Sequence, residues 1–401
     1  MIKERLEKIL CEIDEVTKNG YSDEEHVGAL VGLSGISLFQ FYYSKYKDTN
    51  DHSTIGVEIL QRATKKINQG YNYPTFCNGI GGAGWVLNHL DENGFIDIDC
   101  DELLSTFDDL LYSMMVSDMR RKNYDFLHGG IGYALYFIGR YRNAKSKQLK
   151  KKYRAYLFEF IDLLKANSEK DGNGFKWISI QTRGEFHNTY NLGLSHGIAG
   201  IIAILAKLHA FDDFKGNTEN MLKGAVNYVM GYRKENDSFF LFPNLVSSNG
   251  GENGPSRLGW CYGDLGIGLQ LWFASKELDN QALAHEAILI LKHCANRRVP
   301  EETLVKDAAL CHGSYGIALM FLRIYKETLD PDFAEAAEFW MQDGLQKAFH
   351  KDGYAGYKQW RDVDSWKKEI SLLEGITGIG LAIMDYLTDS DNNWDECLLI
   401  S

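Results

Sequence analysis

The stretch Gly259-Trp260-Cys261-Tyr262-Gly263-Asp264-Leu265-Gly266 contains the feature that repeats along this chain of 401 residues. It is a Gly-x-x-Gly turn that runs directly into apolar sequence. A second copy, Cys311-His312-Gly313-Ser314-Tyr315-Gly316, again has polar side chains ahead of its first glycine. Because the turn also occurs without such side chains, the turn and the residues before it need separate explanations.

The turn recurs along the whole chain at intervals of about 50 to 70 residues, and internal repetition of this kind indicates a repeat architecture. We place the seven glycine pairs at Gly32/Gly35, Gly81/Gly84, Gly129/Gly132, Gly197/Gly200, Gly263/Gly266, Gly313/Gly316 and Gly375/Gly378. Each pair leads into a segment that is apolar on nearly every face, which is typical of a helix buried on all sides. Glycine permits the tight entry turn and a close approach of the backbone.

Amphipathic, charged segments alternate with these apolar ones. We expect them at residues 4–17, 55–67, 103–115, 151–165, 219–232, 282–295 and 333–348. Seven helices of each kind in alternation predict an all-α fold, an α/α toroid in which seven outer helices surround seven inner ones. No linker divides the sequence, so we expect a single domain over residues 1–401.

The longer intervals between turns are expected to hold short strand-like insertions, near residues 170–190, 236–256 and 351–370. In the first, Asp171-Gly172-Asn173-Gly174 followed by Phe175 to Ile180 predicts a turn and a short strand. Residues 238–245 and 354–360 show a similar pattern. We interpret these insertions as decorated loops of the repeat.

Composition narrows the class of protein. A hydrophobic fraction of 45% with 24% charged residues is ordinary for a soluble globular chain. The formal net charge of -12 argues against a nucleic-acid partner, because no basic face is available for phosphates. The seven cysteines are scattered, and the sequence shows neither a secretory signal nor a membrane-spanning apolar run. We therefore expect a cytoplasmic protein, whose cysteines serve as core, metal or catalytic groups.

The residues ahead of the turns differ between repeats, although a closed repeat places equivalent positions on one rim. Directly before the first glycine stand Val31, Ile80, His128, His196, Tyr262, His312 and Glu374. One residue earlier stand Leu30, Gly79, Leu127, Ser195, Cys261, Cys311 and Leu373. A purely structural device would not need reactive side chains in the middle and late repeats only, so we interpret these positions as a functional site.

Cys261, Cys311 and His312 supply two thiolates and one imidazole from neighbouring repeats. Three protein ligands with a fourth position open are typical of a catalytic zinc site, so we expect one Zn2+ per chain. Two thiolates neutralise the dication and leave a metal suited to holding another thiolate. A free cysteine is more often a small buried hydrophobe. The equivalent register of Cys261 and Cys311 is what favours the metal.

His196 shares this rim, and Asp125 lies four residues before the turn of the third repeat. A carboxylate beside an imidazole orients it and raises its pKa, as a general acid or base requires. Arg257 stands four residues before Cys261 and would bring a fixed positive charge near the metal. For Arg257 alone, a surface ion pair is the more ordinary explanation.

At these residues the sequence resembles the LanC family, the lanthipeptide (lantibiotic) cyclases, in its stand-alone class I type. The motifs that carry the resemblance extend over nearly the whole chain: Tyr124-Asp125-x-x-x-Gly129, Ser195-His196-Gly197-Ile198-Ala199-Gly200, Arg257-x-x-Trp260-Cys261-Tyr262-Gly263, Cys311-His312-Gly313 and Leu373-Glu374-Gly375-Ile376-Thr377-Gly378. The family fold is a toroid of seven inner and seven outer helices. Its reaction is an intramolecular Michael addition, in which a peptide cysteine attacks dehydroalanine or dehydrobutyrine and closes a lanthionine or methyllanthionine ring.

The resemblance implies a role for each matching residue. Cys261, Cys311 and His312 would bind zinc, and the substrate thiol would take the fourth position as a thiolate. The acid/base residues of the family match His196 and Asp125, and the sequence leaves open whether His196 accepts or donates the proton. Arg257 would stabilise the developing enolate, and Tyr262 matches a tyrosine beside the metal in the family. His128 departs from the family pattern, which has an acidic residue there.

The resemblance also implies partners. The substrate would be a dehydrated lanthipeptide precursor with leader and core. A dehydratase and an ABC exporter would join the cyclase in a membrane-associated complex, which would bring a cytoplasmic enzyme to the inner face of the membrane.

Three alternatives stay open at this point. The first is a LanC-like enzyme that adds glutathione or another free thiol to dehydroamino acids. The second is an α/α-toroid glycosidase that uses Asp125, Asp264 and Glu374 as its carboxylates. The third is a non-catalytic binding scaffold. The glycosidase leaves the Cys and His pattern unexplained, and a scaffold has no use for an open metal position.

Overall fold

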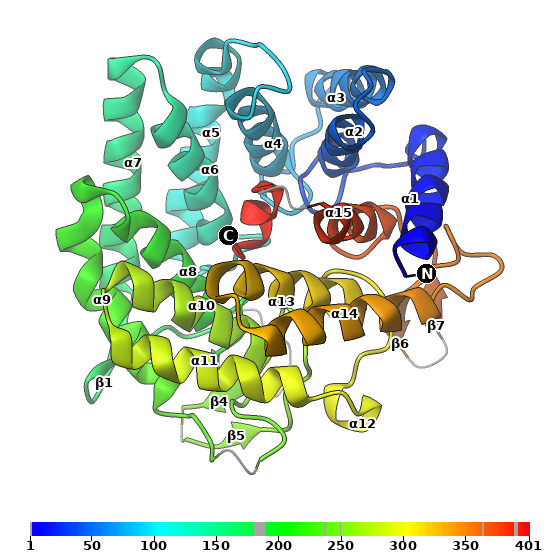
Figure 1. Cartoon of the computed structure of the whole chain (residues 1–401). Helices are drawn as coiled ribbons and strands as arrows, with labels where there is room; N and C mark the ends of the chain where they lie inside the picture. Colours follow the sequence, from blue (N-terminus) through cyan, green and yellow to red (C-terminus); the bar gives the residue numbers. More distant parts are fainter. Residues whose placement is uncertain (1, 180–188, 236–237, 249, 363–364, 389–391) are drawn as a thin grey trace. The chain divides into compact units, whose positions relative to one another are not determined.

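The computed structural model describes residues 2–401 except 180–188, 236–237, 249, 363–364 and 389–391 (Figure 1). The chain divides into two compact units. The first unit comprises Met1–Ile98 and Val305–Ser401, and the second comprises Asp99–Leu304. A single domain over residues 1–401 stays a prediction.

A helix follows each of the predicted glycine turns, and we call these seven the glycine-led helices. In the first unit they are α2 (Leu33–Lys47), α4 (Ile80–Glu92), α13 (Ser314–Thr328) and α15 (Ile376–Leu387). In the second unit they are α6 (Gly130–Asn143), α8 (Ile198–His209) and α10 (Asp264–Glu277). They are buried on nearly every face, and in α8 every residue except Lys207 is buried. The prediction of helices buried on all sides is confirmed.

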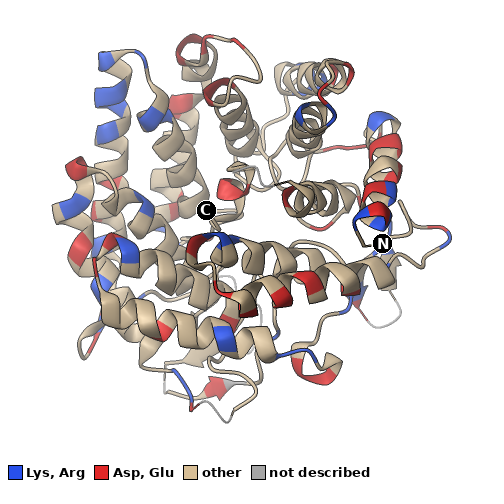
Figure 2. Cartoon of the chain, in the orientation of Figure 1, with Lys and Arg blue, Asp and Glu red and all other residues tan. Residues whose placement is uncertain are grey.

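Amphipathic helices alternate with the glycine-led helices, as predicted. They are α1 (Ile2–Asn19), α3 (Asp51–Asn68) and α14 (Pro331–Gln346) in the first unit and α5 (Cys100–Arg120), α7 (Lys147–Ala166), α9 (Asp212–Met230) and α11 (Gln281–Asn296) in the second, where a short α12 (Pro300–Thr303) follows. Each buries one stripe, as α7 does with Tyr153, Leu157 and Phe160. Figure 2 shows charged residues along the exposed sides of helices such as α1 and α7. Among the described helices, none is long and apolar enough to cross a membrane.

Within each unit the glycine-led helices pack side by side. In the first unit the order of neighbours is α13, α15, α2 and α4, and in the second it is α6, α8 and α10. Most glycine-led helices also pack against the amphipathic helix that follows them, as α13 does against α14 (Figure 1). The N-terminal helix α1 instead packs against α15, the last glycine-led helix. The first and last repeats of the sequence are thereby neighbours in the first unit.

The loop before most of the glycine-led helices folds back to cap the helix. The first N–H groups of a helix have no partner inside it, and no side chain caps α13. Three of these groups donate to carbonyl oxygens seven residues earlier, at 3.2–3.4 Å: Ser314 to Asp307, Tyr315 to Ala308 and Gly316 to Ala309. The same three bonds occur in α2: Leu33 to His26, Ser34 to Val27 and Gly35 to Gly28.

This folded-back loop is what requires the second glycine of the turn. A Cβ atom at Gly316 would lie 1.9 Å from the carbonyl oxygen of Leu310, six residues earlier. The same distance separates Gly378 from the oxygen of Leu372. Both contacts are with backbone, which cannot move aside as a flexible side chain can, so no other residue fits there.

The contacts correct the predicted register of the second repeat. Helix α4 begins at Ile80 with Gly79 as its N-cap, and a Cβ at Gly82 would lie 2.0 Å from the oxygen of Phe76. The turn is therefore Gly79/Gly82, and the predicted pair Gly81/Gly84 was wrong. Glycines at positions 79, 81, 82 and 84 offer two overlapping Gly-x-x-Gly frames, and only the helix start distinguishes them.

Backbone hydrogen bonds join successive turns, and we call this series the turn belt. In the first unit it runs from Cys311 N–H to Leu373 O, from Leu373 N–H to Leu30 O and from Leu30 N–H to Cys77 O, at 2.9–3.0 Å. In the second unit it runs from Phe126 N–H to Ser195 O and from Ser195 N–H to Cys261 O, both at 3.2 Å. Residues two positions before the first glycine, or three in the case of Phe126, therefore do lie on one rim within each unit.

The insertions form three small antiparallel sheets. They are β1 (Glu169–Asp171) with β2 (Gly174–Lys176), then β3 (Thr189–Asn191) with β4 (Leu245–Ser247) and β5 (Glu252–Asn253), and β6 (Gln359–Asp362) with β7 (Ser365–Lys367). The predicted turn at residues 171–174 is confirmed. Parts of the predicted insertions, at residues 180–188, 236–237, 249 and 363–364, lie outside the described residues.

The other two predicted strands were misplaced. Residues 238–244 form no strand, because the N–H groups of Leu241 and Phe242 donate at 2.9 Å to the carboxylate of Asp264 and not to a neighbouring strand. In the last insertion, Tyr354 and Tyr357 close a tight turn, and the strand begins only at Gln359.

We expect Gly378→Ala to lower the free energy of unfolding by about 3 kcal/mol, because its Cβ would overlap a backbone oxygen that the helix cap holds in place. Gly216→Ala is the matched control, since Gly216 lies in α9 with nothing within 4 Å of its Cβ position. That change should raise stability by about 0.5–1 kcal/mol. Urea unfolding of both variants is the measurement. Equal stability of the two would contradict the close-approach explanation.

Candidate metal centre

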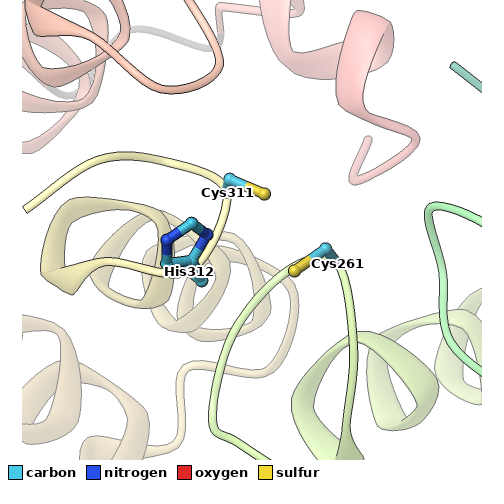
Figure 3. Close-up of side chains that lie close together, drawn as sticks. All are labelled: Cys261, Cys311 and His312. Atoms are coloured by element: carbon cyan, nitrogen blue, oxygen red, sulfur yellow. The ribbon is translucent and has the colours of Figure 1, made fainter. Parts of the chain in front are cut away.

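Cys261, Cys311 and His312 lie close together (Figure 3). One ligand atom from each residue, the two sulfurs and a ring nitrogen, lies within 4.8 Å of the others. Both cysteines are buried, with exposed fractions of 6% and 8%, and neither forms a disulfide. The three residues that the sequence proposed as metal ligands therefore form one group.

The turns fix the backbone at each of these residues. The carbonyl oxygen of Cys261 accepts from both the N–H and the hydroxyl of Ser195 at 3.2 Å. Two residues later Gly263 adopts φ 95°, a left-handed conformation that favours glycine. The N–H of Cys311 donates to Leu373 at 3.0 Å. The turn belt thus holds the cysteine backbones, and the sulfurs need little further ordering.

The donor set fits a tetrahedral metal ion. Zinc binds cysteine sulfur at about 2.3 Å, which places two sulfur ligands about 3.8 Å apart in a tetrahedral site. Atoms that already lie within 4.8 Å of one another need only a small adjustment to reach that spacing. Two thiolates and one imidazole also suit a borderline-soft dication and leave a fourth position for an outside ligand.

A cysteine at the same repeat position as Cys261 and Cys311 is not necessarily a metal ligand. With the turn of the second repeat corrected, Cys77 occupies the same position as Cys261 and Cys311, and Asn78 occupies the position of His312. The group of potential ligand atoms among the described residues contains no atom of Cys77. The contrast between apolar early repeats and reactive late ones, which we used to infer a site, is therefore weaker than expected.

His196 and Asp125 form the expected pair. Nδ1 of His196 hydrogen-bonds to Oδ2 of Asp125, which leaves Nε2 for a reacting group. Asp125 is buried, and its other oxygen accepts the N–H of His128 at 2.6 Å. Burial by itself lowers the pKa of His196, but the hydrogen bond and charge of Asp125, with a further contribution from Cys261, raise it above its usual value.

Tyr262 and Arg257, the other two candidates, both lie in the loop before α10. The ring of Tyr262 lies 5.8 Å from that of His196, centroid to centroid, at an angle of 45°. Arg257 is half-buried in the loop before α10, and its carbonyl oxygen closely approaches Gly263. An approach of its guanidinium to the metal ligands stays a prediction.

Two carboxylates lie near His312: Asp307, which had no role in the sequence interpretation, and Glu374, which entered it only in a family motif and as a candidate glycosidase carboxylate. Oδ2 of Asp307 lies 3.5 Å from Nε2 of His312. Glu374 hydrogen-bonds to Gln359, and burial raises its pKa even though the nearby His312 opposes the shift. The only signal for Asp307 was its position six residues before Gly313, where other repeats also carry polar residues such as Asn191 and Glu369.

Residues 26–399 match the family described as lanthionine synthetase C-like protein. The chain belongs to this family. Nisin biosynthesis protein NisC of Lactococcus lactis subsp. lactis is 22% identical to it, over 100% of this chain and 95% of that protein. Glutathione S-transferase LANCL1 of Danio rerio is 24% identical, over 82% of this chain and 77% of the relative. The resemblance inferred from the turn motifs is confirmed.

A solved structure of nisin cyclase shows the same fold, with a TM-score of 0.69 and 19% sequence identity over 100% of this chain and 97% of that one. This likeness confirms the predicted fold class, an α/α toroid. A possible member of the GH105 family from Salmonella enterica has a TM-score of 0.50 at 12% identity and covers 96% of this chain and 94% of its own. At that identity the second likeness concerns the fold alone.

We expect this family member, purified without chelator, to carry about one zinc ion per chain, and Cys311→Ala to lose it because only two ligands remain. Cys11→Ala is the control, since Cys11 is an exposed free thiol outside the group. Elemental analysis of wild type and both variants is the measurement. If Cys311→Ala still binds zinc, then Cys261, Cys311 and His312 are not the zinc ligands.

Proposed function

We propose that this protein is a zinc-dependent lanthipeptide cyclase. In this proposal it forms lanthionine and methyllanthionine rings, by adding cysteine thiols of a dehydrated precursor peptide to dehydroalanine or dehydrobutyrine in the same peptide. The observation that carries the proposal is the group of two buried thiols and one imidazole, whose ligand atoms lie within 4.8 Å of one another. Similarity to nisin biosynthesis protein NisC over the full chain supports the choice of reaction.

Cys261, Cys311 and His312 would hold one Zn2+ per chain. Bound zinc lowers the pKa of a coordinated substrate thiol, so that a thiolate nucleophile exists at neutral pH. The protein's own contribution is to bury the two cysteines and to keep their backbones in the turn belt. The position left open by three protein ligands would receive the substrate sulfur.

His196 is our candidate for proton transfer. In the addition, the thiol loses its proton, a bond forms between sulfur and the β-carbon, and the α-carbon of the resulting enolate gains a proton. Asp125 holds Nδ1 of His196, so Nε2 is the nitrogen that exchanges the proton. A raised pKa keeps the imidazole protonated to a higher pH, which favours donation to the enolate carbon.

Arg257 and Tyr262 complete the proposed catalytic set. A guanidinium close to the reacting amide would stabilise the negative charge that develops on the enolate oxygen. Tyr262 directly follows a metal ligand, and its ring is 5.8 Å from that of His196. We therefore assign Tyr262 to the wall of the site that lies between metal and acid.

The proposed reaction also defines the partners. The substrate would be a precursor peptide with leader and core, and a dehydratase would have to form its dehydroamino acids beforehand. An ABC exporter would remove the product, in a cytoplasmic complex at the membrane.

Addition of glutathione or another free thiol to dehydroamino acids is a second candidate. It is supported by the 24% identity to a relative named Glutathione S-transferase LANCL1. The same metal ligands and the same acid would serve, and the two reactions differ in whether the thiol belongs to the acceptor peptide.

The glycosidase alternative has less support. Asp264 is fully buried, and its carboxylate accepts hydrogen bonds from Arg297 and from two backbone N–H groups at 2.9 Å. Burial raises its pKa although Arg297 opposes the shift. We infer that this carboxylate joins the loop of residues 241–242 to α10 and does not meet a substrate. Asp125 is likewise engaged by His196.

A peptide with one dehydroalanine and one cysteine tests the proposal. Ring closure leaves its mass unchanged but consumes the free thiol, so iodoacetamide should label the peptide before incubation and not after. A mass increase equal to glutathione, when glutathione is supplied, would favour the second candidate. A cysteine that stays alkylatable at the rate seen without enzyme would contradict the cyclase.

In the same assay, His196→Ala should slow ring closure by about 10²–10⁴-fold while keeping its zinc, because this residue acts on protons and not on the metal. Cys311→Ala, which should lose the zinc, is the comparison.

We expect Asp125→Asn to lower the pKa of His196, because burial remains while the charge and the hydrogen bond that raise it are lost. In wild type the raised pKa stabilises the fold at pH values below the ordinary pKa of histidine, and this contribution disappears as the pH rises through the folded pKa. An NMR titration of His196 is the measurement. Asp352→Asn, at an exposed carboxylate beside Lys358, is the control, and equal midpoints in wild type and Asp125→Asn would contradict the pair.

A further inference from the structure

The carboxylate of Asp307 has three neighbours and is almost completely buried, with an exposed fraction of 2%. Oδ1 accepts the N–H of Ala309 at 3.2 Å. Oδ2 accepts the N–H of Trp360 at 3.0 Å and lies 3.5 Å from Nε2 of His312. A buried carboxylate is costly unless it is paired or hydrogen-bonded, so each of these contacts contributes to keeping it in place.

Glu369 shows what a carboxylate does at this position when no metal ligand is nearby in the turn. It lies six residues before Gly375, as Asp307 does before Gly313. Oε1 of Glu369 accepts the N–H groups of Ile370 and Ser371 at 3.1 Å, and Oε2 pairs with Lys367 at 3.0 Å. Both carboxylates thus stabilise their own loop by accepting backbone N–H groups. In Asp307 a single oxygen, Oδ1, does this.

Asp307 differs from Glu369 in the surroundings of its second oxygen, Oδ2. This oxygen accepts the backbone N–H of Trp360 at 3.0 Å and lies within ion-pair distance, 3.5 Å, of Nε2 of His312. A histidine that binds metal commonly directs its other N–H at a carboxylate, which fixes the ring orientation and the tautomer. With Nε2 of His312 beside this oxygen, Nδ1 is the nitrogen left for the metal.

We propose that Asp307 is a positioning residue for His312 and holds its ring so that Nδ1 faces the metal ion. This inference rests on the proposed zinc site. It also assigns a role to the last insertion, because strand β6 fixes the carboxylate through the N–H of Trp360. The preceding residue, Gln359, hydrogen-bonds to Glu374, the residue of the seventh repeat that is equivalent to His312. One strand thereby orders both acidic side chains beside the imidazole.

Asp307→Asn tests the proposal at nearly constant shape. The amide can present only one acceptor oxygen, so either the N–H of Ala309 or the N–H of Trp360 loses its acceptor, and the negative charge 3.5 Å from Nε2 of His312 is removed. We expect zinc affinity, measured by competition with a colorimetric chelator, to fall about 10–100-fold. Glu369→Gln is the matched control and should stay within about threefold of wild type, because its carboxylate contacts its own loop and Lys367.

Affinity in Asp307→Asn equal to wild type, or an equal loss in both variants, would overturn the positioning role while leaving the zinc site intact. Wild-type protein that takes up no zinc would instead contradict the proposed function itself. If Asp307→Asn does not fold, NMR of wild-type protein with ¹⁵N-labelled histidine and bound zinc decides the question. A proton on Nε2 and metal on Nδ1 of His312 is expected, and metal on Nε2 would overturn the proposal.

Discussion

The unpaired N–H groups at the start of the glycine-led helices are the constraint on which the rest of this structure depends. A helix leaves its first N–H groups without partners, and in α2 and α13 no side chain caps them. The chain satisfies them by folding the preceding loop back, so that carbonyl oxygens seven residues earlier accept the bonds. That loop leaves no room for a Cβ at the second glycine, as the contact of Gly316 with Leu310 shows. One backbone requirement thus accounts for the motif that recurs through the sequence.

The same loops determine where chemistry is possible. Their backbones are hydrogen-bonded from turn to turn, and the residues just before the first glycine are held on this belt. Two buried thiols and an imidazole occur there with their ligand atoms within 4.8 Å of one another. Because the helices supply the rigidity, these residues can vary freely in type from repeat to repeat. Leu30 and Leu373 pack in two of the repeats, whereas Cys261 and Cys311 offer sulfur.

Three buried aspartates have different roles because their neighbouring residues differ. Asp264 is engaged by Arg297 and backbone N–H groups, and its role is structural. Asp125 pairs with His196 and raises the pKa of that imidazole. Asp307 divides its oxygens between its own loop and the surroundings of His312. All three carboxylates are buried, and the partner decides what each of them does.

The sequence by itself determined the alternation of buried and amphipathic helices, the turns and the grouping of Cys261, Cys311 and His312. The helices and turns follow from local patterns, because apolar periodicity and glycine sterics act over a few residues. The grouping of the two cysteines and the histidine was predicted from the equivalent register of Cys261 and Cys311 in their repeats. Only the tertiary structure decided the register of Gly79/Gly82, the failure of residues 238–244 to form a strand and the position of Asp307 beside His312. Each of these depends on a partner distant in the sequence or on where a helix begins, as in the bonds from Leu241 to Asp264 and from Trp360 to Asp307. The local sequence around a carboxylate, a glycine pair or an apolar run does not show which distant residue it will contact. The role of such a feature is therefore fixed only when the chain is folded.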